Sequence, residues 1–134
     1  DRWLVLIGPA GNTLLQCGER AGLRVAGEAW IDRTYDATGS LLPHTHSRAT
    51  IKTPQEVLRQ ANSLIRYGEV TAADGTRVQL EFETIHLHSR IPQAHYVAEE
   101  IRRMVPDASA LTAEPFSIDS PEESEVFPSL AYSV

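Results

Sequence analysis

The sequence has few cysteines and no long apolar runs. Cys17 is the single cysteine among 134 residues, so no disulfide can form within the chain. It lies in an apolar helical pattern, and we expect a buried thiol there rather than a nucleophile. No apolar run approaches the roughly 20 residues that a membrane-spanning helix needs. We therefore expect a soluble, cytoplasmic protein with no membrane partner.

Positive charge is missing from the last part of the chain. Residues 106–134 contain six acidic residues and no Lys or Arg, whereas residues 1–105 contain 12 residues of each sign. The formal net charge of −6 therefore belongs to the C-terminal part, and the rest is neutral. Binding to nucleic-acid phosphates needs clustered Lys and Arg, so we do not expect nucleic acid as a partner.

The first residues predict a βαβ unit. Trp3–Ile7 is a continuous apolar run closed by glycine and proline, which is typical of a buried strand. A helix follows, capped by Asn12 or Thr13 and ended by Gly22. A second apolar run over 23–27 then predicts another strand. Two strands joined in this way pair in parallel through a right-handed crossover.

The next helix is marked by both of its ends. Thr53 is the expected N-cap, and it forms a capping box with Glu56 at the third helical position. Pro54 occupies the first helical position, where proline is favoured. Gly68 is expected to end the helix after Tyr67. One face of this helix is apolar, and we expect the opposite face, which includes Gln60, to be solvent-exposed.

Three further elements complete the predicted domain. Residues 70–82 predict a hairpin with Asp74 and Gly75 as its two-residue turn, and Thr84–His88 predict a short strand. Pro92 opens a last helix. Its predicted buried stripe consists of Ala94, Val97, Ala98, Ile101 and Val105.

Periodicity fails from Pro106 on. Residues 106–134 mix proline, serine and acidic residues with scattered aromatics, and such segments cannot bury enough apolar surface to fold. We therefore predict one domain over residues 1–105 and a disordered acidic tail over residues 106–134.

Candidate site residues follow the second apolar run. Glu28, Asp32, Arg33 and Tyr35 lie where a parallel strand ends, and side chains at such ends converge on the ligand. A carboxylate there can act as general base, while Arg33 can bind a substrate carboxylate or keep Asp32 ionised. In the alternative interpretation, Asp32 and Arg33 only fasten the loop, and Tyr35 packs beneath them.

The histidines divide into two groups. His86 and His88 alternate along a predicted strand, so we expect them on opposite faces and not on one ligand. His88, at the strand end, is the functional candidate, and His86 is expected to be a core histidine with a satisfied hydrogen bond. His44 and His46 are interpreted as a solvated loop rather than a metal site, because no carboxylate or cysteine stands at ligand spacing.

Two stretches carry a resemblance to a known family. "GLRVAGEAWIDRTYDATGSLLP" and "RYGEVTAADGTRVQLEFETIHLH" resemble the second half of the LamB/YcsF family, known as the A subunit of 5-oxoprolinase. The similarity covers about residues 3–105. It is most specific over Glu28–Tyr35, where the family reads approximately Glu-x-Phe-Ala-Asp-Arg-x-Tyr, over the following "DATGSLLP", and at the strand ending in His88.

The resemblance implies both a fold and an activity. The implied fold is an α/β one, a partial (β/α) barrel of the polysaccharide-deacetylase-like type. The implied activity is ATP-dependent opening of the 5-oxoproline lactam, with other 5-oxoprolinase subunits as partners and no metal assigned. On this basis the candidate catalytic residues are Glu28, Asp32 and His88, and the candidate substrate-binding residues are Arg33 and Tyr35.

The chain also departs from the family pattern. It has no counterpart of the family's N-terminal Asp-Leu-Asn-x-Asp and Cys-Gly-Phe-His stretches. Arg90 stands where the family has an acid, and His44 stands where it has an arginine.

Three functions stay open from the sequence. The first is a subunit of the 5-oxoprolinase type, the second is a non-enzymatic module that pairs with another half-barrel, and the third is a small independent hydrolase. A half-barrel also predicts an open flank with exposed apolar residues such as Leu4, Leu6 or Leu87, and hence self-association.

Overall fold

The computed structural model describes residues 4–105. The predicted tail, residues 106–134, lies outside the described residues, so its disorder stays a prediction. The elements are β1 (Val5–Pro9), α1 (Thr13–Arg20), β2 (Arg24–Trp30), α2 (Pro54–Tyr67), β3 (Glu69–Thr71), β4 (Arg77–Gln79), β5 (Thr84–His86) and α3 (Ala94–Met104).

The main sheet is parallel and open. Its order is β1-β2-β5, and the parallel pairing of β1 with β2 confirms the predicted βαβ unit. Residues 4–105 contribute three strands to this sheet, and β3 and β4 form a separate antiparallel pair. These strands do not close into a barrel.

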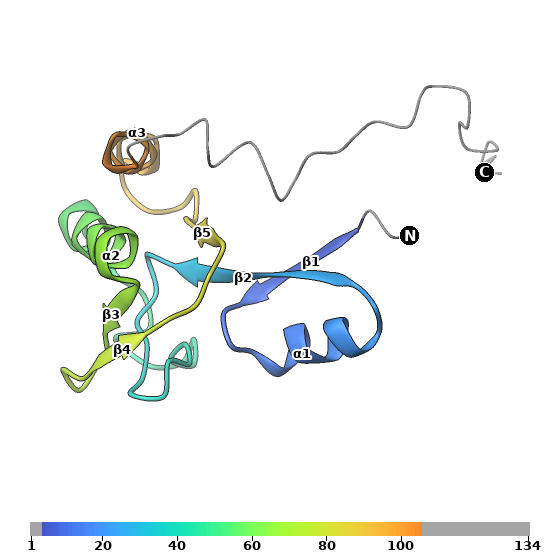
Figure 1. Cartoon of the computed structure of the whole chain (residues 1–134). Helices are drawn as coiled ribbons and strands as arrows, with labels where there is room; N and C mark the ends of the chain where they lie inside the picture. The colour runs from blue at the N-terminus through green and yellow to red at the C-terminus, as the bar shows by residue number, and fades with distance from the viewer. Residues whose placement is uncertain (1–3, 106–134) are drawn as a thin grey trace, which may run out of the picture.

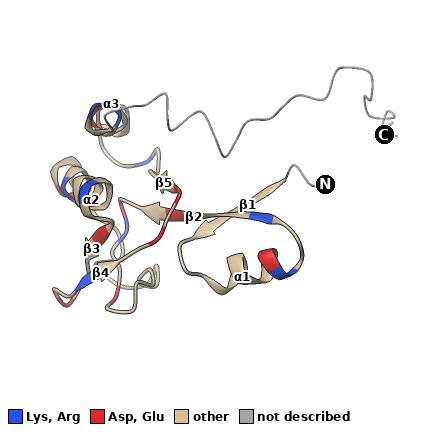
Figure 2. Ribbon diagram, in the orientation of Figure 1, with Lys and Arg blue, Asp and Glu red and all other residues tan. Residues whose placement is uncertain are grey.

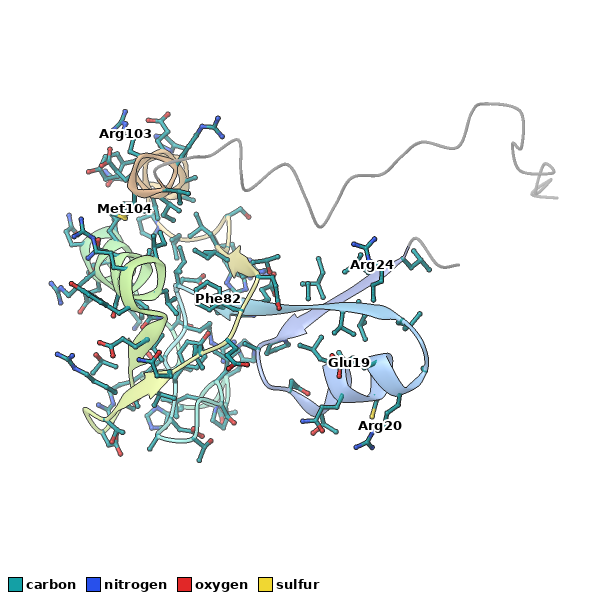
Figure 3. The ribbon with its side chains drawn as sticks, viewed as in Figure 1. Glu19, Arg20, Arg24, Phe82, Arg103 and Met104 are labelled. Carbon is teal, nitrogen blue, oxygen red and sulfur yellow. The ribbon has the colours of Figure 1, made fainter. Side chains whose placement is uncertain are left out.

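The helices lie at two ends of the molecule. Figure 1 shows α2 and α3 side by side at one end and α1 beside β1 and β2 at the other, with the long strand β2 running between them. The core lies at the α2 end, and its largest fully buried side chains include Ile31, Leu64 and Val57. Phe82, which precedes β5, packs against this core and lies beside β2 in the middle of the molecule (Figure 3).

The predicted cap residues are confirmed, although the Glu56 carboxylate contacts the Thr53 hydroxyl and not the Thr53 backbone N–H of a full capping box. The Thr53 hydroxyl accepts from the Glu56 backbone N–H at 3.4 Å and donates to the Glu56 carboxylate at 2.5 Å. Gly68 ends α2 with φ of 65°, a left-handed conformation that favours glycine. Of the two proposed caps for α1, Asn12 is the one used, since its side chain accepts from the Leu14 N–H at 2.9 Å.

The hairpin is confirmed, but its turn is longer than predicted. Ala72 N–H donates to the Thr76 carbonyl at 2.8 Å, so three residues and not two lie between the arms. Gly75 takes φ of 91°, as three-residue hairpin loops require at their last position.

The predicted stripe of α3 is only partly correct. Val97 is fully buried and Ile101 is half-buried, but Ala98 is exposed. The reason is that α3 packs on one neighbouring helix, α2, so a narrower face is covered.

The β1 and α1 end leaves apolar side chains in solvent. Leu4 is 61% exposed and Ile7 is 45% exposed, although Leu6 and Leu87 are half-buried. Cys17 is exposed, so the prediction of a buried thiol is wrong. The prediction of a fully buried first strand is also wrong, because β1 is an edge strand of the described sheet and no strand among residues 4–105 pairs with its outer edge.

Charge of both signs is spread over the described elements. Figure 2 shows Lys and Arg interspersed with Asp and Glu at both ends of the molecule. None of the described helices is long and apolar enough to cross a bilayer.

The exposed edge predicts self-association. An unpaired strand edge beside exposed apolar residues is a template for pairing with another chain. We expect Ile7→Lys to shift the sedimentation distribution of the recombinant chain toward monomer, because a charge on an edge strand opposes pairing. Tyr67→Lys, a matched change of an exposed residue on α2, should leave it unchanged. A wild-type chain that sediments as a sharp monomer and binds no hydrophobic dye would contradict the open flank.

Candidate functional site

The segment that follows β2 is fixed from three sides. Ile31 N–H donates to the His86 carbonyl at 3.2 Å, and the Asp32 carbonyl accepts from Ile51 N–H at 2.9 Å. The Gln60 side-chain nitrogen of α2 lies 3.0, 3.2 and 2.8 Å from the carbonyl oxygens of Trp30, Ile31 and Arg33. The backbone that carries Asp32 therefore has little freedom to move.

Asp32 and His88 form the closest polar pair of the site. Asp32 is fully buried, and its Oδ2 lies 2.5 Å from Nδ1 of His88 and 3.2 Å from the His88 backbone nitrogen. The His88 side chain is 38% exposed. The pair thus joins a carboxylate inside the protein to an imidazole that solvent can reach.

The hydrogen-bond pattern determines which imidazole nitrogen is free. Oδ2 accepts from the His88 backbone N–H, and a carboxylate accepts but does not donate, so Nδ1 of His88 carries the hydrogen. Nε2 is then the basic nitrogen, free to take up a proton. The other Asp32 oxygen, Oδ1, is buried and has no hydrogen-bond partner among the described residues.

A second carboxylate–histidine pair lies next to the first. Glu28 Oε1 lies 3.1 Å from His86 Nδ1, the His86 ring stacks on Trp30 at 3.9 Å, and the His86 and His88 ring centroids are 4.6 Å apart. The prediction that the two histidines lie on opposite faces is wrong. Strand geometry ends at His86, so alternation does not extend to His88. Glu28 itself lies within β2 and not past its end.

Arg33 is buried, and its hydrogen-bond partners are uncharged. It is 3% exposed, its Nε donates to the Ala49 carbonyl at 2.9 Å, and its Nη2 donates to the Leu42 carbonyl at 2.6 Å. Its Nη1 lies 3.0 Å from Nε2 of His44. Because a guanidinium only donates, His44 accepts there and is neutral. No carboxylate among residues 4–105 forms an ion pair with Arg33.

Tyr35 lies beneath the site. It is 3% exposed, and its hydroxyl accepts from the Trp30 backbone N–H at 2.7 Å. Burial raises the pKa of Tyr35, although the Trp30 hydrogen bond opposes the shift. This position matches the alternative interpretation of a packed tyrosine, since Tyr35 does not line the pocket described next.

A pocket of about 500 Å³ opens beside the Asp32–His88 pair, and we call it the site pocket. Its ionisable lining consists of Asp32, Arg33, His44, Lys52, His88 and Arg90. It therefore brings together three of the five predicted site residues and leaves out Glu28 and Tyr35. Among residues 4–105, no group of three or more His, Cys, Asp or Glu side chains is arranged to hold a metal ion.

Sequence reasoning missed two residues of the site. The helical pattern places Gln60 on a solvated face, yet its amide holds the Asp32 segment. His44 is exposed, as the solvated-loop interpretation predicts, but its contact with Arg33 was not predicted. Neither contact leaves a local pattern in the sequence, because both join residues more than ten positions apart.

The comparisons with known proteins agree with one another. The LamB/YcsF family profile matches residues 1–119. The 5-oxoprolinase A subunit of Methylococcus capsulatus is 40% identical over 102 residues, 76% of this chain and 39% of that protein. The corresponding A subunit of Symbiobacterium thermophilum is 39% identical over 121 residues, 90% of this chain and 44% of that protein.

A solved structure is also similar. The crystal structure of a lactam utilization protein from Thermus thermophilus matches with a TM-score of 0.68 and 33% identity, covering 78% of this chain and 41% of that one. The chain thus spans about two fifths of the length of the relatives that it matches.

Proposed function

Because the chain belongs to the LamB/YcsF family, we propose that it supplies part of the A subunit of a 5-oxoprolinase, which opens the 5-oxoproline lactam to glutamate. The names of its relatives and of its structural neighbour, a lactam utilization protein, support this reaction class. The three parallel strands then belong to a larger (β/α) barrel of the deacetylase-like type, completed by the part of the relatives that this chain does not match.

The observation that carries the proposal is the Asp32–His88 pair at the site pocket. A lactam opens when water adds to its carbonyl carbon, the carbon–nitrogen bond breaks and the nitrogen gains a proton. A histidine oriented by a buried carboxylate is suited to accept the proton of that water and to return it to the leaving nitrogen. His88 has this arrangement, with Nε2 available for the transfer.

We propose different roles for the predicted catalytic residues. Asp32 is fully buried, so we propose that it acts through His88 as a positioning residue and not as the base itself. Glu28 orients His86, which packs against the His88 ring. The second pair thereby limits the rotation of His88.

Only the resemblance to the LamB/YcsF family implies ATP as a cofactor. In parallel α/β folds a nucleotide phosphate commonly binds at a helix N-terminus after a strand, a place that Gly11 and Asn12 occupy here. The pocket beside them, of about 630 Å³, is lined by Glu19, Glu81 and Glu83 and, among the described residues, by no Lys or Arg. This position does not fit a triphosphate, so we assign no step through ATP to it. The other 5-oxoprolinase subunits are proposed partners.

The proposal is tested with a hybrid protein, in which this chain replaces the matched segment of the Methylococcus relative. With partner subunits and ATP, we expect the hybrid to release glutamate from 5-oxoproline. The isolated chain should not do so even with the same partners, because it spans only 39% of that relative. A stably folded hybrid without turnover would contradict the proposal, and turnover by the isolated chain would favour an independent hydrolase.

One observation favours a second function. The exposed apolar residues at β1 suit a module that pairs with another half-barrel and does no chemistry of its own. An inactive hybrid, together with binding of the separate chain to the separately produced remaining part of the relative, would favour this alternative.

A further inference from the structure

The site pocket has an unusual charge for this chain. Its lining contains the cations Arg33, Lys52 and Arg90 against one carboxylate, that of Asp32. The Asp32 oxygen Oδ2 is already engaged with His88. The imbalance is local, since the chain as a whole carries a net charge of −6.

Among these cations, Arg33 gives the strongest indication of a bound anion. A guanidinium stays charged in proteins, and burying a charge without a counter-ion is costly. Its hydrogen-bond partners among residues 4–105 are two backbone carbonyls and a neutral imidazole, and these leave two of its five N–H groups without a hydrogen bond. Its guanidinium carbon also lies 5.8 Å from the centroid of the Trp30 ring, which is an uncharged contact. Burial, pocket lining and the lack of a counter-ion within this part of the chain together indicate that an anion completes the site.

We propose that the site pocket binds the carboxylate of a small organic acid, with Arg33 as the deep cation and the exposed Arg90 and Lys52 as the outer ones. The volume of about 500 Å³ suits a small ligand. Ile51, Ile91 and Pro92 also line the pocket, and they suit the hydrocarbon part of such an acid. A guanidinium is the side chain best matched to a planar carboxylate.

The inference rests on the proposed function in one respect: 5-oxoproline is a lactam that carries such a carboxylate. If Arg33 holds that carboxylate, the lactam ring lies in the same pocket as His88. The carboxylate then fixes which side of the ring faces the base.

The test measures binding to the full chain with four probes. These are 5-oxoproline, the uncharged lactam 2-pyrrolidinone, the lactam-free acid cyclopentanecarboxylate and inorganic phosphate. We expect both carboxylates to bind at least about tenfold more tightly than 2-pyrrolidinone, as measured by NMR titration. Equal binding of 5-oxoproline and 2-pyrrolidinone would overturn the inference, and so would tighter binding of phosphate than of either acid.

Two substitutions assign the binding to this pocket. Arg90→Gln should weaken binding of both acids by about three- to tenfold without affecting the fold, because Arg90 is exposed. Arg59→Gln is the matched control, since Arg59 is exposed on α2 and lines a neighbouring pocket. Arg33→Lys should weaken binding further. If that variant does not fold, the comparison of Arg90→Gln with Arg59→Gln decides the question, and equal affinities in these two variants would refute the pocket assignment.

The outcomes separate this inference from the proposed function. Binding of cyclopentanecarboxylate that depends on Arg90 supports the carboxylate site even if the hybrid protein never hydrolyses 5-oxoproline. Turnover by the hybrid without any preference for carboxylates refutes the inference and leaves the proposed function in place.

Discussion

Asp32→Asn is expected to lower kcat of the hybrid 5-oxoprolinase by about 10²- to 10⁴-fold, the range that general acid–base catalysis contributes. Asparagine keeps the size of the side chain, and its carbonyl oxygen can take the place of Oδ2, which accepts from both the backbone N–H and Nδ1 of His88. The imidazole then keeps its orientation, but it loses the buried negative charge that stabilises its protonated form. KM should change by less than about threefold, since Asp32 is fully buried and acts through His88.

Asp74→Asn provides the matched control. Asp74 lies exposed in the β3–β4 turn, where asparagine is also favoured, so we expect activity within about twofold of the unsubstituted hybrid. A hybrid carrying Asp32→Asn that keeps its kcat would show that the pair is structural. A hybrid whose KM rises while its kcat holds would instead assign Asp32 to substrate binding.

Gln60→Glu is expected to lower the free energy of unfolding by about 2 to 4 kcal/mol. The substitution removes the NH₂ group that three carbonyl oxygens share and places a carboxylate oxygen against them. For a domain of this size, we expect a fall in Tm of roughly 10 to 20 °C. Urea unfolding followed by circular dichroism measures the effect.

Gln55→Glu is the control for this change. Gln55 lies on the same helix and is exposed, so the identical substitution should alter stability by less than about 0.5 kcal/mol. Gln60→Leu should lie between the two, because it removes the donors without adding a charge. Equal stability of Gln60→Glu and Gln55→Glu would mean that the Gln60 contacts do not hold the Asp32 segment.

The features that the sequence predicts correctly are local. The Thr53 cap, the Gly68 end of α2 and the presence of the β3–β4 hairpin each depend on residues within a few positions of one another. The βαβ start is also local in this sense, since two apolar runs and one short helix leave few topologies. The resemblance adds Asp32, Arg33 and His88, which the fold does bring to one pocket.

The features that sequence reasoning missed depend on contacts between distant segments. His88 follows β5, yet the Asp32 carboxylate, 56 positions earlier, fixes its ring on the same side as His86. Gln60 looks solvated on a helical wheel, although its long side chain reaches the backbone after β2. Cys17 fits an apolar pattern but is exposed, because no described element packs on that side of α1.

The position of the hydrogen on the His88 ring is the most direct test of the proposed Asp32–His88 pair. Two-dimensional ¹⁵N–¹H spectra of the histidine-labelled chain, recorded in the Ile7→Lys background to limit self-association, report which ring nitrogen carries the hydrogen. Neutral His88 is expected to carry it on Nδ1, and Asp32→Asn, whose carbonyl oxygen can take the place of Oδ2, is expected to keep it there. A His88 that carries its hydrogen on Nε2 in the presence of Asp32 would contradict the proposed base and its orientation.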